Sequence, residues 1–321
     1  MQSIDKILCV VDPTTSVQPA MHRAAWLANK VGAELDLFVC YYNEYLSGER
    51  FLDAPSLRKA RAEVVSRNLP YLNKIAEPLR SAGLTVQTNV VWDHPLYAGV
   101  VRHATKTGAQ IVFKDTHHHS AMDRALLTNT DWNLIRTCPV PLWLVKPSDL
   151  HQQPVFVAAI DPTHEHDKPA SLDDCILGMT SLLAGKTSAD MHVFHSFDPR
   201  IALATATANA YIPASLPYEE IEKDMRELHG RHFEEILISY EFDDDHKHLI
   251  SGATHEELPA IAKKLGADVI VMGAIARNRW KRLFVGATAE RTLEHLPCDL
   301  LIIKPDWFET PVEKDRNESA G

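Results

Sequence analysis

The chain has 321 residues, with 33 Lys and Arg against 43 Asp and Glu, and a formal net charge of -10. This acidic balance gives no electrostatic footprint for nucleic acid or anionic lipid, so we expect neither as a partner. No apolar run reaches about 18 residues, and the first six residues lead straight into an apolar run, so we expect no membrane insertion and no signal peptide. Five scattered cysteines without a CxxC spacing favour a reduced, cytoplasmic protein.

The first half of the chain alternates short apolar runs with helical patterns. An apolar run at 7–11 ends in Asp12-Pro13-Thr14 and leads into a helical pattern at 21–28. The remaining predicted elements are a strand at 34–40, a charged helix at 57–79, a strand at 85–92, a helix at 96–106, a strand at 110–113, a helix at 129–137 and a strand at 142–145. Strands that are apolar throughout and separated by helices indicate a parallel sheet covered on both faces. We therefore predict a doubly wound α/β fold, in which ligands lie at the carboxyl ends of the strands.

The second half of the chain repeats the first. Residues 115–146 align without a gap with residues 273–304, at an offset of 158 positions. Asp12-Pro13-Thr14 matches Asp161-Pro162-Thr163 at an offset of 149, so insertions separate the strands. Such a repeat predicts two copies of one domain of ordinary size. We place the domains at 1–149 and 150–308, followed by a charged tail at 309–321 that we expect to be disordered from Pro311 onward.

The order of these motifs resembles the universal stress protein family in its tandem-domain form. The resemblance rests on a first strand that ends in Asp, the run 265–273, the turn Gly286-Ala287-Thr288 and the final strand after Pro297. It covers the chain from about Ile4 to Lys304. The resemblance implies two Rossmann-like domains of the adenine nucleotide alpha hydrolase type and a role in the stress response. It also implies an internal pseudo-dimer in which the strands at 142–145 and 300–303 pair, with a homodimer left open.

The phosphate loop of the second half is incomplete. In ATP-binding members of the family the loop reads G-x-x-G, nine residues, then G-[ST], because glycines let backbone N–H groups approach phosphate and the hydroxyl donates one more hydrogen bond. Here Gly273, Gly286 and Thr288 remain, but Ala276 replaces the second glycine and Ala287 replaces the hydroxyl. A methyl at positive φ costs roughly 1 kcal/mol and a lost phosphate hydrogen bond about 1.5 to 3. We therefore expect weak ATP binding at most, and no required cofactor.

The first half departs further from that pattern. The matching positions are Asp115, His118, Thr128 and Asn129. A carboxylate repels a triphosphate, so we expect no ATP binding by this route in the first half.

Other positions to which the resemblance assigns a role survive in both halves. Asp12 and Asp161 match an Asp that binds the nucleoside, whereas Cys40 and Ser196 match a position that faces the adenine. Asp-Pro-Thr is equally typical of a turn that ends a strand and begins a helix. Both interpretations stay open from the sequence.

Three other patterns carry less weight. Gly185-Lys186-Thr187 imitates the end of a P-loop but leaves a predicted helix, which is the reverse of the required context. His117-His118-His119 and His164-Glu165-His166-Asp167 lie in predicted loops, yet neither gives a complete ligand set, so we expect no metal there. No spacing of nucleophile, base and orienting group is present, so we name no catalytic residue.

An uncharged insertion at 201–211 follows the second strand of the second half and could cover the ligand site as a lid. Its small apolar side chains suit an apolar, lipid-like ligand as well as plain packing. We therefore expect a stress-response protein that acts through binding of a small molecule or protein rather than through catalysis. The alternatives are a weak ATP or AMP sensor in the second half, a carrier of an apolar compound and, less favoured, a slow ATPase.

Overall fold

A computed structural model describes residues 3–46, 54–119, 124–163, 171–200, 218–274, 293 and 295–313, with only the backbone for residues 117–119 and 124–126. The chain divides into two compact units. Unit 1 comprises Met1–Asp149 and Trp307–Gly321, and unit 2 comprises Leu150–Asp306. The division differs from our boundaries at the end of the chain, because the segment from Trp307 onward groups with unit 1.

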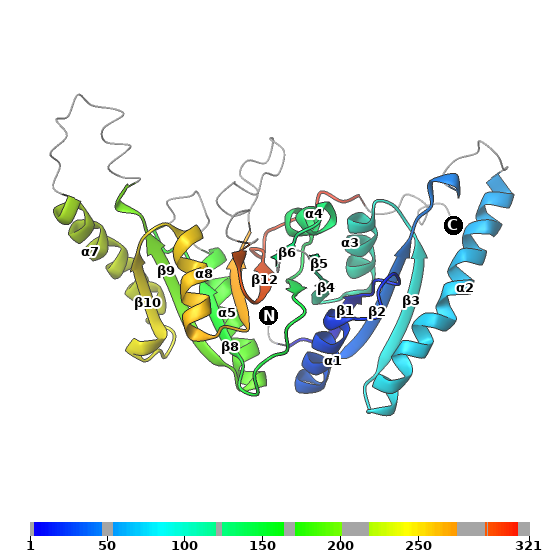
Figure 1. Cartoon of the computed structure of the whole chain (residues 1–321), viewed down its shortest axis with the longest axis horizontal. Helices are drawn as coiled ribbons and strands as arrows, with labels where there is room; N and C mark the ends of the chain where they lie inside the picture. Colours follow the sequence, from blue (N-terminus) through cyan, green and yellow to red (C-terminus); the bar gives the residue numbers. More distant parts are fainter. Residues whose placement is uncertain are drawn as a thin grey trace, which may run out of the picture. The chain divides into compact units, whose positions relative to one another are not determined.

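Unit 1 contains a five-stranded parallel sheet with the strand order β7-β4-β1-β2-β3 (Figure 1). Its elements in chain order are β1 (Lys6–Val10), α1 (Pro19–Val31), β2 (Glu34–Tyr41), η1 (Glu44–Leu46), α2 (Ala54–Ser81), β3 (Val86–Trp92), α3 (Leu96–Thr107), β4 (Ile111–Asp115), β5 (His117–His119), β6 (Arg124–Leu126), α4 (Asn129–Thr137) and β7 (Leu142–Val145). This alternation confirms the predicted doubly wound fold.

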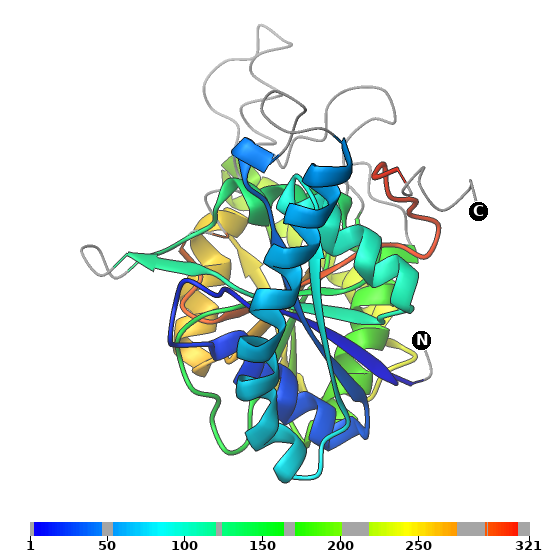
Figure 2. The ribbon, with the colours of Figure 1, turned by 90° about the vertical axis from the view of Figure 1, so that its right-hand side faces the viewer.

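Local sequence explains where these elements begin and end. The central strands are apolar on both faces, and β1, β2 and β4 are almost wholly buried. Helices α1 and α3 end at Gly32 and Gly108, whose φ angles of 76° and 69° lie in the left-handed region that glycine favours. The long helix α2 packs against β2 and β3 and covers that side of the sheet (Figure 2).

The segment His117–His119 is a strand rather than the loop that we expected. It forms β5, which pairs in antiparallel fashion with β6 in a separate two-stranded sheet. This hairpin stands out from the main sheet of unit 1 (Figure 2). The expectation of a loop was wrong because three residues are too few for a period to be recognised, and the pairing partner lies seven residues further along the chain.

Unit 2 repeats the same topology, with the strand order β10-β9-β8-β11-β12 (Figure 1). Its elements are β8 (Val155–Ala159), α5 (Ser171–Thr187), β9 (Asp190–Phe197), α7 (Tyr218–Leu237), η2 (Asp244–His246), β10 (Lys247–Ser251), α8 (Thr254–Leu265), β11 (Val269–Gly273) and β12 (Asp299–Ile303). The chain is therefore a tandem pair of doubly wound domains. The rejected P-loop imitation, Gly185-Lys186-Thr187, forms the last turn of α5.

Strand order places a switch point in each unit. In unit 1 the chain runs from β1 to one side through β2 and β3, and to the other side through β4 and β7. In unit 2 the corresponding switch lies between β8 and β11. In each unit the loops that follow the two neighbouring strands, β1 and β4 or β8 and β11, lead away from each other at the carboxyl edge of the sheet. Open α/β sheets bind their ligands at this edge.

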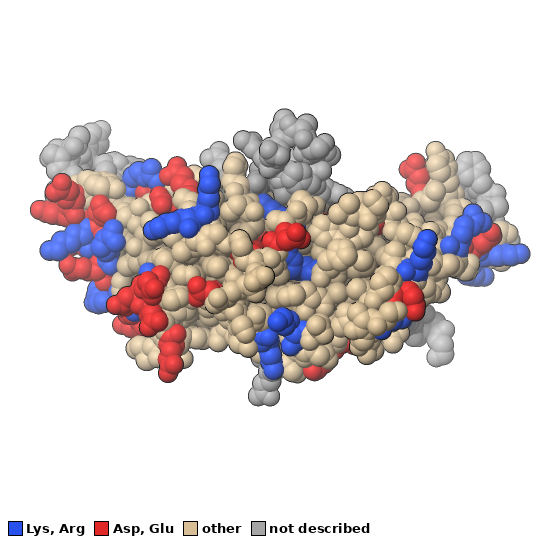
Figure 3. All heavy atoms as spheres, turned by 60° about the horizontal axis from the view of Figure 1, so that its bottom comes forward, with Lys and Arg blue, Asp and Glu red and all other residues tan. Residues whose placement is uncertain are grey.

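Surface features agree with the composition. Among the described residues, no helix is both long enough and apolar enough to cross a membrane. On the face drawn in Figure 3, acidic and basic side chains are interspersed at the α7 end of unit 2. None of the five cysteines forms a disulfide among the described residues, and Cys9, Cys138 and Cys298 are buried.

Candidate functional site

Unit 1 brings three predicted site residues to one edge of its sheet. Asp12 follows β1, Cys40 lies near the end of β2 and Asp115 ends β4. These strands are neighbours in the order β4-β1-β2, so the three residues lie at adjacent carboxyl ends. His118 lies instead on the β5–β6 hairpin.

Unit 2 repeats this arrangement with Asp161 after β8, Ser196 near the end of β9 and Gly273 at the end of β11. These strands are also neighbours, in the order β9-β8-β11. The other predicted loop positions lie outside the described residues, as does the proposed lid at 201–211; they are Ala276, Gly286, Ala287 and Thr288.

In unit 1 a carboxylate occupies the N-terminus of α1. Asp115 Oδ1 accepts a hydrogen bond of 2.6 Å from the backbone N–H of Ala20, in the first turn of the helix. Gln18, at the N-cap position, makes no side-chain cap of its own. Because the first N–H groups of a helix and its dipole attract anions, the Asp115 carboxylate is stabilised at the start of α1.

A second carboxylate closes the N-terminus of α4. Thr128 is the N-cap residue, and its hydroxyl and backbone N–H both donate to Asp131 Oδ2, at 2.8 and 2.7 Å. The backbone N–H of Asp131 donates in return to Thr128 Oγ1 at 3.2 Å, which completes a capping box. Lys114 Nζ lies 2.8 Å from the other oxygen of the fully buried Asp131. Asn129 is the first, exposed residue of this helix.

These contacts involve Asp115 and Thr128, two of the positions in unit 1 that match the phosphate loop. At the start of α1 the backbone N–H of Ala20 donates to the Asp115 carboxylate, and at the start of α4 the N–H of Asp131 donates to the Thr128 hydroxyl. A polyphosphate near the start of α1 would meet the charge of the Asp115 carboxylate at short range.

Gly273 in unit 2 has a packing role. A Cβ added there would lie 2.8 Å from Leu172 Cγ, closer than real Cβ contacts, and its φ angle is not in the positive region. At the matching position of unit 1, Asp115 instead accepts a hydrogen bond from the backbone N–H of Ala20. Gly273 permits the close approach of α5 to β11, whereas positive φ does not explain it.

The two Asp-Pro-Thr segments form the same local contact. Asp12 Oδ1 accepts hydrogen bonds from Thr14 N and Thr14 Oγ1, at 2.8 and 2.6 Å. Asp161 Oδ1 accepts one from Thr163 Oγ1 at 3.2 Å. Each Asp therefore stabilises its own turn, as the turn interpretation requires.

Cys40 contacts the loop that follows the next strand, and Ser196 contacts the helix that follows the next strand. Cys40 Sγ donates to the Asp93 carbonyl oxygen at 3.3 Å, and Ser196 Oγ lies 2.8 Å from Thr254 Oγ1, at the start of α8. Burial, reinforced by the nearby Asp93 carboxylate, raises the pKa of the Cys40 thiol to about 12. The thiol is therefore protonated at neutral pH and is a poor nucleophile.

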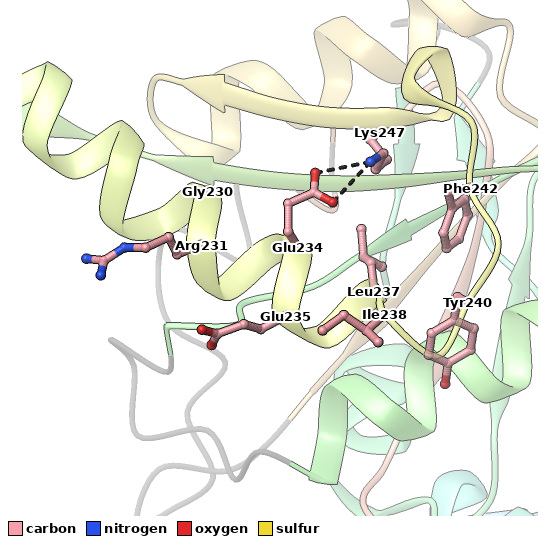
Figure 4. A pocket seen from close by; sticks show the side chains of 9 residues that line it. All are labelled: Gly230, Arg231, Glu234, Glu235, Leu237, Ile238, Tyr240, Phe242 and Lys247. Atoms are coloured by element: carbon pink, nitrogen blue, oxygen red, sulfur yellow. Dashed lines mark hydrogen bonds and ion pairs between the residues drawn. The ribbon is translucent and has the colours of Figure 1, made fainter.

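A surface pocket of about 510 Å³ lies elsewhere on unit 2 (Figure 4). Leu237, Tyr240 and Phe242 line it, and Lys247 Nζ lies 3.0 Å from a carboxylate oxygen of Glu234 at its side. Lys247 is the first residue of β10. The pocket is therefore at the amino ends of the strands, opposite to the edge that carries the predicted ligand position.

Sequence reasoning missed three residues that shape the site. Asp131 was detectable, because Thr128-Asn129-Thr130-Asp131 has the spacing of a capping box with Asp in place of Glu. Lys114 and Leu172 gave no such signal. Their roles depend on contacts between a strand and a distant helix, and these contacts follow from the tertiary fold.

Comparison with known proteins supports the repeat. The family model described as "Universal stress protein family" matches residues 3–146 and 173–304. Universal stress protein E of Escherichia coli K12 is 26% identical over 322 residues, covering 99% of both chains. A functionally unknown protein from Pseudomonas aeruginosa PAO1 has a similar structure, with a TM-score of 0.67, 26% identity and coverage of 95% of this chain and 94% of that one. A universal stress protein from Archaeoglobus fulgidus shares the fold at 16% identity, with a TM-score of 0.65 and coverage of 94% and 98%.

Proposed function

Because this chain belongs to the universal stress protein family, we propose that it is a stress-response protein that acts by binding a ligand or partner rather than by catalysis. Unit 1 serves as a structural domain without nucleotide, and any adenine nucleotide binds weakly to unit 2. We propose that it acts in the cytoplasm, which five cysteines without a disulfide support.

The contact between Asp115 and the N-terminus of α1 carries this proposal. Ala20 N donates a hydrogen bond of 2.6 Å to Asp115 Oδ1. This contact supports the proposal because a side chain of unit 1 already uses an N–H group that could bind phosphate. The capping box on α4 supports the same conclusion independently, because Thr128 uses its hydroxyl to bind Asp131. We therefore expect the N-termini of α1 and α4 to contribute little to phosphate binding in unit 1, although helix N-termini favour phosphate in this kind of fold.

Unit 2 retains more of the binding pattern. Gly273 offers no carboxylate, and Gly286 and Thr288 remain in the sequence. Ala276 and Ala287 are the two departures from the family's ATP-binding loop. We attribute weak binding to these two methyl groups, since one restricts a backbone that must adopt positive φ and the other replaces a hydroxyl donor.

The first experiment restores the loop. The double variant Ala276→Gly/Ala287→Ser should gain roughly 2 to 4 kcal/mol of ATP binding free energy over the wild type, measured by titration calorimetry. A matched change in unit 1, Asp115→Gly, should give no measurable ATP binding because Asp131 and the Thr128 cap remain. Low-micromolar binding by the wild type, or no gain in the double variant, would show that the loop does not limit affinity.

A second experiment identifies what the protein carries. Native mass spectrometry of freshly purified chain should show the mass of the polypeptide with little or no bound nucleotide. A stoichiometric adenine nucleotide would favour the sensor alternative, and phosphate released from it over time would favour the slow ATPase. A co-purified apolar compound would favour the lipid-like carrier.

A further inference from the structure

A cluster of imidazoles lies at the start of β9 and β10 in unit 2. Asp190 and His192 are alternate residues of β9 and therefore share one face of the sheet. His246 immediately precedes β10, and the parallel pairing of Val193 with Lys247 brings it beside His192. His246 Nε2 lies 2.9 Å from Asp190 Oδ1, and His192 Nε2 lies 3.4 Å from Asp190 Oδ2.

The orientation of both rings is fixed by their other nitrogens. His192 Nδ1 lies 3.0 Å from His248 Nε2, and His246 Nδ1 lies 2.9 Å from Asp245 Oδ1. The rings of His192 and His246 are stacked, with centroids 4.6 Å apart. Metal-binding histidines typically present one ring nitrogen to the ion and hold the other by a hydrogen bond to a neighbouring group. Both Nε2 atoms here converge on one carboxylate in that way.

The spacing of the three donors suits a small transition ion. Each residue of the cluster offers one ligand atom, and the three atoms from Asp190, His192 and His246 all lie within 4.8 Å of one another. A tetrahedral ion with bonds of about 2.0 to 2.2 Å holds its ligand atoms roughly 3.3 to 3.6 Å apart, so only small shifts would be needed. The Asp190 side chain is 38% exposed and that of His246 25%, which leaves the cluster open to solvent for entry of an ion and a fourth ligand.

The equivalent place in unit 1 has a different chemistry. The strand registers match Asp190, His192 and His248 with Glu34, Asp36 and Asn89. Asp36 is buried and accepts a hydrogen bond from Asn89 Nδ2 at 2.8 Å. Its other oxygen lies 2.9 Å from Nε2 of a buried histidine on α3. Unit 1 therefore uses this place for a buried polar network, whereas unit 2 has the buried His192 beside the partly exposed His246 and Asp190.

From this geometry we infer a site for a divalent transition metal ion of the Zn²⁺ class, with Asp190, His192 and His246 as ligands and a water or a partner's side chain as the fourth. Imidazole with carboxylate is a donor set that suits Zn²⁺, and an ion there would join the first residues of β9 and β10. The site lies at the amino ends of the strands, so it is separate from the proposed ligand position at the carboxyl ends.

The test uses the full chain after removal of metal with a chelator. We expect calorimetry with Zn²⁺ to give one strong site per chain, and Co²⁺ to give the intense visible bands of four-coordinate geometry. His246→Gln and Asp190→Asn should each weaken binding by at least about 100-fold, since changes in outer-shell partners alone cost 10- to 100-fold. His22→Ala removes an exposed imidazole from α1 and should change nothing.

Two further measurements make the outcome decisive. The metal-free thermal midpoint of each variant should match that of the metal-free wild type, and Zn²⁺ should raise the midpoint of the wild type but not that of His246→Gln. A combined change of His117, His118 and His119 to Ala should leave binding intact. The inference is overturned if the wild type binds no ion at a ratio near one, if His246→Gln and Asp190→Asn bind as the wild type does, or if the hairpin variant abolishes binding.

Discussion

Asp115 and Gly273 occupy the same position of the repeat but make opposite contacts. Asp115 extends a carboxylate to the N-terminus of α1, whereas Gly273 has no side chain because Leu172 occupies that space. One position of the repeat therefore carries a carboxylate in unit 1 and no side chain in unit 2, although the strand order of the two units is the same.

The packing of Gly273 gives a prediction about stability. Gly273→Ala should lower the free energy of unfolding by about 1 to 3 kcal/mol, because the new methyl overlaps Leu172 in a close-packed junction. Gly178→Ala is the matched control in the same unit. It lies within α5 with no atom near its added Cβ, so it should be neutral or stabilising by roughly 0.5 to 1 kcal/mol. Urea denaturation followed by circular dichroism measures both, and equal effects would show that the overlap is relieved.

The pKa of Cys40 gives a prediction about pH. Burial raises this pKa to about 12, so the folded state favours the protonated thiol more than the unfolded state does. The stability that this provides is complete below the ordinary thiol pKa of about 8.5 and is lost as pH rises toward 12. Iodoacetamide should therefore label Cys40 slowly at pH 9 in the folded protein and rapidly in urea, as mass spectrometry can measure. Equal labelling rates in both states would contradict the protected thiol.

At the level of elements, the N-terminus of α4 shows how unit 1 closes a helix end with its own side chains. Helix α4 begins with a capping box whose Asp131 is fully buried and lies 2.8 Å from Lys114 Nζ. The sequence of the second half has Met272 and Ala289 at the matching positions of the repeat, and neither residue is charged. The second half of the repeat therefore has an apolar residue at each position that carries a charge of the Lys114–Asp131 ion pair in unit 1.

A double-mutant cycle tests that replacement. Lys114→Met alone should cost about 3 to 5 kcal/mol of unfolding free energy, because it leaves the Asp131 carboxylate buried without its cation. The double variant Lys114→Met/Asp131→Ala should recover most of this loss, apart from roughly 1 kcal/mol for the missing cap. Chemical denaturation of the wild type, both single variants and the double variant gives the coupling energy. Additive losses would show that the two charges do not depend on each other.

At the scale of the whole molecule, one fold has been duplicated and the copies have diverged. Both units keep the same strand order, and the chain end belongs to unit 1, where Thr310 Oγ1 donates to the Thr137 carbonyl oxygen at 2.7 Å. The polar contacts of the two units differ much more than their strands do. Carboxylates contact the N-termini of α1 and α4 in unit 1, and imidazoles gather at the starts of β9 and β10 in unit 2.

The family resemblance leads to a prediction about the two final strands. We expect β7 and β12 to pair with each other across an internal pseudo-twofold axis, so that one chain imitates a family dimer. In a parallel sheet only alternate amides of β7 bond to β4, and those of β12 to β11. Amide exchange followed by NMR should show slow exchange for the remaining amides of both strands as well. Rapid exchange of those amides would mean that both edges are open.

Most of the fold was predictable because its signals are local. Apolar runs and helical periods depend on neighbouring residues, and the predicted strand at 142–145 and helix at 129–137 agree with β7 and α4 to the residue. The repeat then required two domains of the same kind. The β5–β6 hairpin escaped because its strands have only three residues each, too short to show a period.

The sequence by itself determined the strand and helix order, the duplication and the family, because each is encoded in neighbouring residues or in the alignment of one half with the other. The tertiary structure decided which side chains meet. Ala20 and Asp115 are 95 positions apart, and Asp190 and His246 are 56 apart. Their contacts arise because strand order and register bring distant residues to one edge of a sheet, and no local period records that register.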